Sequence, residues 1–321
     1  MHLGAMKTEL FETASVDSRR TWILAVPVLA FAFFIVGQLL TILPADHFGL
    51  VSRETIETYP TILYLIIGAF SMTALLFFAW LRFFERRSWA SAGLRLGDGA
   101  GRNYLLGFGL GLFMAASVVY AVRLLGGYEV EAEVALQLRD LVPILILMCA
   151  FMLQSGTEEL IFRGWVLGRV AARYGLWAGV ITNSVLFTLM HLDTDALAAQ
   201  GLSGILLFVV MTFLFSVFLS LLAIKERSIW GAAAWHAAWN WMFITWFGLP
   251  TTGIELNLVP LVSDLMPAPD AAVWLTGGTD GPEGSVFALI VLVLGCVWLL
   301  RSLRSQKKRI DATRVAHEST G

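Results

Sequence analysis

The sequence predicts an all-α, polytopic membrane protein, with about eight transmembrane helices enclosing a polar intramembrane cavity. Three observations predict this class. The 321 residues are 58% apolar and 14% charged, with a mean hydropathy of +0.75, whereas a soluble domain is about 45–50% apolar and about 25% charged. The apolar residues form runs of about 20, the length that a helix needs to cross a bilayer. The few charged residues inside these runs share helix faces, which indicates a functional site.

Eight apolar stretches have this length. Their predicted bounds are 21–43, 61–82, 104–125, 142–168, 175–191, 204–224, 229–247 and 285–300. The fourth stretch carries charges in its second half, and Pro143 near its start is compatible with a helix N-terminus. The segment 248–284 contains five prolines and is the longest connection between spans. We expect it to be an irregular external segment that lies on the bundle or folds back toward it.

The basic residues predict the orientation. Eighteen of the 22 Lys and Arg fall on one side of the eight spans. Arg53, Arg123 and Arg139 fall on the other side, and Arg163 lies within the fourth span. By the positive-inside rule both termini are cytoplasmic, and the predicted location is the cell (inner) membrane. A net charge of −2 gives no basic excess, so nucleic acid is not expected as a partner.

The same pattern divides the chain into four regions. These are a polar cytoplasmic segment (1–20), the N-terminal transmembrane helices (21–125), the membrane core that carries the polar clusters (140–300) and a basic cytoplasmic tail (301–321). The first 100 residues contain no motif that predicts a function.

The first polar cluster lies in the fourth span. Glu159 and Arg163 are four residues apart, so on a helix they share a face and pair. Glu158 then points about 100° away, free to face a cavity as a general base. The alternative is a salt-bridged helix end near the membrane interface.

Two further clusters show the same four-residue spacing. Phe187 and His191 lie on one face of the fifth span, and Asn183 extends that face. His236 and Asn240 lie on one face of the seventh span, among five alanines that leave room for a polar pocket. The alternatives are an interfacial histidine in the first case and interhelical hydrogen bonds in the second.

In chain order these clusters resemble the three motifs of the CPBP family (CAAX protease and bacteriocin-processing-like), which are intramembrane endopeptidases: Glu-Glu-x-x-x-Arg, Phe-x-x-x-His and His-x-x-x-Asn. The run 277–285 is also similar to a Gly-Pro-Glu-Gly-Ser segment that often precedes the last helix in bacterial members. The resemblance covers roughly residues 140–290.

The resemblance implies hydrolysis of peptide bonds in membrane-associated proteins or peptides. It implies a catalytic set and a supporting set: Glu158, His191, His236 and Asn240, and Glu159, Arg163 and Phe187. In the catalytic set, Glu158 activates water with His191 as its partner, while His236 and Asn240 stabilise the oxyanion. Peptide hydrolysis needs both a base for water and donors for the tetrahedral oxyanion.

The sequence does not decide whether the site binds a metal ion. Glu158, His191 and His236 are also the ligands that a His2-Glu zinc site would use. The chain lacks the His-Glu-x-x-His signature of single-helix zinc sites, so no cofactor is expected and zinc is the alternative.

The sequence leaves three rival functions open. A non-catalytic scaffold or bacteriocin-immunity protein would keep the fold and bind a partner, and a transporter is the second rival. The third is a rhomboid-type serine protease, because residues 201–204 read Gly-Leu-Ser-Gly. In rhomboids, however, the His-x-x-x-Asn helix precedes the serine, and here it follows.

The predicted span bounds conflict with a single site that contains Glu158, His191 and His236. At about 1.5 Å per residue, straight spans with the predicted bounds put His191 near the outer end of its helix. Glu158 and His236 then lie nearer the inner side, too far away to meet it.

Overall fold

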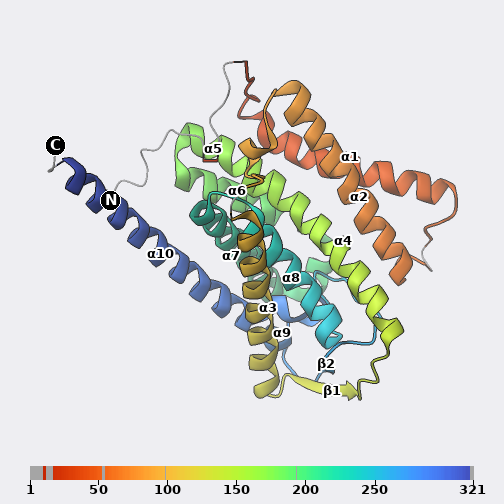
Figure 1. Cartoon of the computed structure of the whole chain (residues 1–321). Coiled ribbons are helices and arrows are strands. Elements are labelled where there is room, and N and C mark those ends of the chain that lie inside the picture. Colours follow the sequence, from red (N-terminus) through yellow and green to blue (C-terminus); the bar gives the residue numbers. More distant parts are fainter. Residues whose placement is uncertain (1–9, 12–16, 53–54, 98, 193, 319–321) are drawn as a thin grey trace.

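The computed structural model describes residues 10–11, 17–52, 55–97, 99–192 and 194–318. It is a helical bundle whose main helices lie at the eight predicted places (Figure 1). These are α1 (Ala25–His47), α2 (Tyr59–Ala79), α3 (Ala100–Leu124), α4 (Leu141–Glu159), α6 (Leu176–Met190), α7 (Thr194–Glu226), α8 (Trp230–Phe247) and α10 (Val286–Glu318). A π-helical turn, η4 (Leu160–Val166), joins α4 to α5 (Leu167–Tyr174).

Within the described chain, six helical segments are long and apolar enough to cross a membrane. They contain α1, α2, α3, the α4–η4–α5 run, α7 and α10. The helix α6 is a shorter apolar helix, and α8 is almost entirely buried inside the bundle. The predicted class, an all-α polytopic membrane protein, is confirmed.

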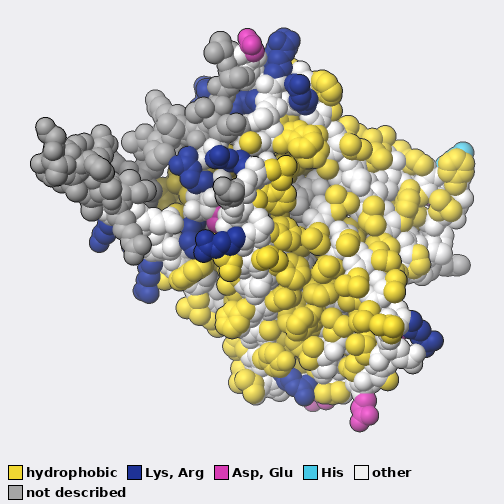
Figure 2. Space-filling model, viewed as in Figure 1, with side chains coloured by type: hydrophobic (Ala, Val, Ile, Leu, Met, Phe, Trp, Pro, Cys, Tyr) yellow, Lys and Arg dark blue, Asp and Glu magenta, His cyan; other side chains and the backbone are white. Residues whose placement is uncertain are grey.

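The outer surface of the bundle is apolar. Large hydrophobic side chains of α1, α3 and α10 are exposed, among them Val28, Leu105, Phe113 and Leu294. Figure 2 shows hydrophobic side chains as a broad band over the middle of the face, with most Lys and Arg gathered toward the upper left. Soluble monomers rarely expose an apolar surface this extensive, so we interpret the band as the surface that faces lipid.

Small residues bring α3 against α8. A Cβ atom at Gly107 would lie 2.2 Å from the backbone oxygen of Gly231, and one at Gly111 would lie 2.5 Å from that of Trp235. Only glycine permits such close approach, as in the small-xxx-small contacts of membrane helices. This packing places α8, which carries His236 and Asn240, at the centre of the bundle.

The segment after α8 folds back onto the bundle, as predicted. Its strand β2 (Asp264–Pro267) pairs antiparallel with β1 (Tyr128–Ala132), which follows α3. The short helix α9 (Val273–Thr276) and the 3-10 turn η5 (Gly278–Gly284) then lead into α10. The strand pair is a small addition that the sequence did not predict.

A buried carboxylate ties the N-terminal helices to the core. Glu85 accepts hydrogen bonds from Thr21 Oγ1 (2.6 Å), Trp165 Nε1 (3.0 Å) and both Nε and a terminal nitrogen of Arg169. Burial by itself would raise the pKa of Glu85. The hydrogen bonds and charge of Arg169, together with Thr21 and Trp165, outweigh burial and hold this pKa below its usual value.

Candidate active site

The glutamate of the first motif and the histidine of the second lie at one level. The α4–η4–α5 run and α6 form a hairpin about Gly175, which has a φ of +94°. Glu158 precedes this glycine by 17 residues and His191 follows it by 16. Because each residue of a helix advances the chain by about the same distance, the two side chains lie at about the same distance from the turn. Glu158 Oε2 lies 3.9 Å from His191 Nε2.

The expectation that His191 lies near the outer end of a full span was wrong. The helix α6 has 15 residues, a length of about 22 Å, compared with about 30 Å of hydrocarbon. His191 therefore caps a short helix that ends inside the bundle.

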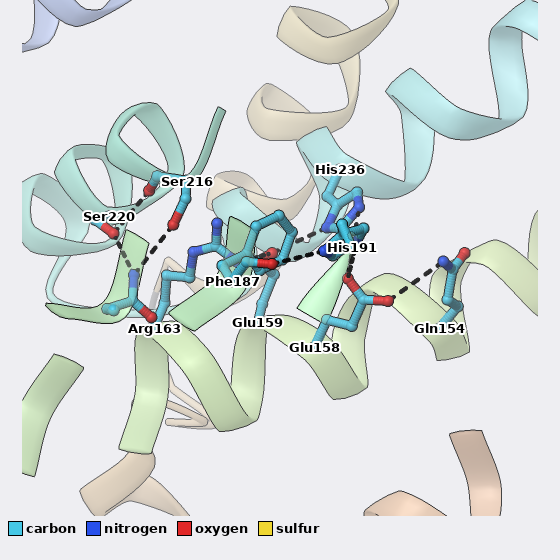
Figure 3. A network of polar contacts seen from close by, with 10 residues as sticks. Gln154, Glu158, Glu159, Arg163, Phe187, His191, Ser216, Ser220 and His236 are labelled. Atoms are coloured by element: carbon cyan, nitrogen blue, oxygen red, sulfur yellow. Dashed lines mark hydrogen bonds and ion pairs between the residues drawn. The ribbon is translucent and has the colours of Figure 1, made fainter. Parts of the chain in front are cut away.

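The third motif joins the same cluster. His236 Nε2 lies 4.0 Å from Glu158 Oε2, and its Nδ1 lies 2.9 Å from Glu159 Oε1. Figure 3 shows the Glu158 side chain pointing toward both histidine rings. The structure thus brings together residues from α4, α6 and α8 that are up to 78 positions apart in the sequence, as Glu158 and His236 are.

Glu158 itself is poorly satisfied. It is 2% exposed, and Gln154 Nε2 donates one long hydrogen bond of 3.3 Å to its Oε1. Its Oε2, the oxygen that faces the histidines, is buried without a hydrogen-bond partner among the described residues. A buried polar atom in this state needs an explanation such as a water, an ion or a catalytic role.

The histidine contacts fix where protons lie. His191 Nδ1 is 2.8 Å from the Phe187 carbonyl oxygen, which only accepts, so Nδ1 carries the proton. The Nε2 of a neutral His191 is then an acceptor that faces Glu158 Oε2, also an acceptor when ionised. A water molecule that donates to both satisfies the pair.

Arg163 balances the charge of the two carboxylates. Its guanidinium donates to Glu159 Oε1 at 2.9 Å and lies over the Phe187 ring, 4.2 Å from the ring centroid. With both glutamates ionised, the cluster keeps one net negative charge.

A small cavity adjoins the cluster. It is lined by His191, His236 and Asn240, among others. The volume that the centre of a water molecule can occupy is about 20 Å³, which is enough for one water. None of the hydrogen bonds among the described residues uses the side-chain amide of Asn240. Two further lining residues, Thr252 and Glu283, come from the folded-back segment.

Sequence reasoning assigned no role to three of these neighbours. Gln154 had a signal, because it lies four residues before Glu158 on the same helix face. Glu283 lies in the Gly-Pro-Glu-Gly-Ser segment, so the motif was noted but its carboxylate was given no role. Thr252 had no signal, because its position depends on how an irregular segment folds.

The arrangement does not fit a zinc ion as it stands. Ligands at zinc-bond lengths around a tetrahedral ion lie about 3.4 Å apart, whereas Glu158 Oε2 is 3.9 and 4.0 Å from the two Nε2 atoms. The described residues include no group of three His, Cys, Asp or Glu arranged to hold a metal ion. We therefore derive no step through a metal.

Comparison with known protein families gives a match over part of the chain. Residues 140–242 match the family model described as type II CAAX prenyl endopeptidase, Rce1-like. This segment of the chain is therefore similar to the CAAX-protease (CPBP) family. No curated protein sequence matches the chain at a significant level.

The CPBP match includes every motif residue of the cluster. It runs from the start of α4 into α8, and so contains both glutamates, Arg163, Phe187, the two histidines and Asn240. The matched family is one of membrane endopeptidases, so the match supports an intramembrane protease activity in general. Thr252 and Glu283 lie beyond the match.

Proposed function

We propose that this protein hydrolyses peptide bonds of membrane-associated proteins or peptides with a water molecule activated by Glu158 and His191. The observation that carries the proposal is the unpartnered Glu158 Oε2, buried 3.9 and 4.0 Å from the Nε2 atoms of His191 and His236. These separations suit a water that bridges the groups from one side.

In the proposed reaction the bridging water donates one hydrogen to Glu158 and one to His191. As the water oxygen attacks the substrate carbonyl carbon, Glu158 takes its proton. The carboxylate then passes this proton to the leaving nitrogen as the tetrahedral intermediate collapses. A base held in buried, water-poor surroundings is effective because few solvent dipoles compete for the charge.

The oxyanion would be held by His236 and Asn240. Glu159 accepts from His236 Nδ1, so His236 donates from Nε2 only when it carries both protons. The Glu159 carboxylate stabilises that cation. Asn240 adds an amide N–H donor from one helical turn further along α8.

The activity is tested with the purified protein and a library of membrane-associated peptides, with prenylated peptides as one arm. Cleavage should persist in a strong chelator and disappear in Glu158→Ala. Cleavage that stops with chelator and returns with zinc would replace the metal-free mechanism by a zinc-dependent one. A wild-type protein that binds peptides without cleaving them would support a scaffold or immunity-type function.

We also propose that both termini are cytoplasmic, with the β1–β2 pair outside. The support is the asymmetry of Lys and Arg along the chain. Reporter tags at Gly4 and after Lys308 should read as cytoplasmic, and a tag near Asp264 as external. An external C-terminal tag would overturn this orientation.

A further inference from the structure

Glu283 is a buried carboxylate that lines the same cavity as apolar residues of α7. Its Oε2 accepts from Trp239 Nε1 at 3.2 Å, and its Oε1 accepts from both Oγ1 (2.8 Å) and the backbone N–H of Thr252. No ion pair among the described residues includes Glu283. A carboxylate has about four acceptor positions, so these three bonds leave one, in a side chain that lines the cavity.

The backbone around Glu283 is held in one place by close crossings. A Cβ atom at Gly281, where φ is +72°, would lie 1.9 Å from the Pro250 oxygen, and one at Gly277 would lie 1.6 Å from the Gly281 oxygen. Thr252, which Glu283 binds, has a φ of +48°, an unusual value for a β-branched residue. Such strain persists only where the surroundings fix it, and it gathers at functional sites.

The cavity offers two kinds of contact to a peptide. Phe208, Met211 and Phe215 of α7 form an apolar wall, and Asn240 and Glu283 supply a donor and an acceptor. A peptide backbone carries both N–H and C=O groups. An N–H group that enters a water-poor cavity without an acceptor is strongly disfavoured.

We propose that Glu283 binds the substrate, by accepting a hydrogen bond from a backbone N–H near the scissile bond. This rests on the proposed peptidase function. Residues of an α-helix already use their N–H groups internally, so the substrate class is a locally extended segment with an apolar side chain. Asn240 contacts the carbonyl that is attacked, and Glu283 holds the neighbouring stretch of backbone.

The test uses ester substitutions in a peptide that the wild type cleaves. The scissile amide is kept, and each neighbouring amide N–H is replaced in turn by an ester oxygen. At one position the ester should lower kcat/KM about tenfold in the wild type, the effect of losing a hydrogen bond to a charged acceptor. In Glu283→Gln the amide peptide should already show this loss, and the ester should cause no further loss.

Trp239→Phe is the matched control. It removes one hydrogen bond to Glu283 but leaves the carboxylate, so the ester penalty should remain. Penalties that multiply in Glu283→Gln, or no sensitive ester position in the wild type, would overturn the proposal. If Glu283→Gln does not fold, Glu283→Asp, which withdraws the carboxylate, serves in its place. A wild type that cleaves no amide peptide contradicts the proposed function itself and is recognised before any ester is tried.

Discussion

Two of the buried carboxylates, Glu85 and Glu158, have opposite surroundings. Glu85 accepts four hydrogen bonds, and one partner, Arg169, matches its charge. Glu158 is just as inaccessible, yet it accepts one long bond and leaves Oε2 without a partner. A satisfied buried charge holds elements together, whereas an unsatisfied one is kept at a cost in stability. From this difference we infer a structural role for Glu85 and a role in the proposed reaction for Glu158.

The largest expected effect comes from replacing the unsatisfied carboxylate. Glu158→Gln should abolish peptide cleavage, because an amide takes no proton from water. Its melting temperature should equal or exceed that of the wild type, since a buried charge without a partner has been removed. Both are measured on one detergent-purified sample. A clear drop in melting temperature would show that Glu158 belongs with Glu85 as a structural residue.

The second effect concerns the amide beside the cavity. Asn240→Ala should lower kcat by about 10²–10³, the usual result of removing one oxyanion donor, and leave KM nearly unchanged. Asn240→Asp should be slower still, because a carboxylate repels the oxyanion. Steady-state kinetics with thermal melts distinguish this from helix packing. A lower melting temperature with full activity per folded molecule would contradict the oxyanion assignment.

Much of the fold and part of the candidate site could be predicted from the sequence. Helix existence followed from apolar runs, and the Glu159–Arg163 pair followed from the four-residue spacing. The depth of His191 within the bundle was predicted wrongly, because the fifth span was assumed to cross the whole membrane. Counting outward from Gly175 would have found it: Arg163 lies 12 residues before the glycine and Phe187 12 after, and these two are in contact.

Other parts had no local signal. Glu85 and Arg169 are 84 positions apart, and both lie just beyond the ends of predicted spans, 61–82 and 142–168. Thr252 reaches the cavity only because glycine crossings fold the segment after α8 back. Pairing between distant, irregular segments depends on the whole bundle, and helical spacing says nothing about it.

The third effect should be on stability alone. Glu85→Gln leaves the buried Arg169 without its charge partner, which typically costs about 3–5 kcal/mol in soluble proteins. Cleavage per folded molecule should be retained, because the hydrogen bonds of the Glu85 side chain go to Thr21, Trp165 and Arg169, and none of these is a residue of the proposed catalytic set. Denaturant or thermal unfolding followed by activity of the folded fraction measures both. Loss of activity without a change in stability would show that Glu85 contributes to the active site.

The smallest effect removes one donor from Glu85. Thr21→Val deletes the 2.6 Å hydrogen bond to its Oε1 and should cost about 1.5–3 kcal/mol at neutral pH, the usual value for a bond to a charged group. Losing this bond lets the lowered pKa of Glu85 in the folded protein rise toward its ordinary value. A lowered folded-state pKa contributes stability above the unfolded pKa of about 4.3, and that contribution is lost as pH falls through the folded value. The difference in melting temperature between wild type and Thr21→Val should therefore be constant from pH 8 to about 5 and shrink in more acidic buffer. A difference that stays the same down to about pH 3 would mean that Thr21 stabilises the protein by packing and not through the charge of Glu85.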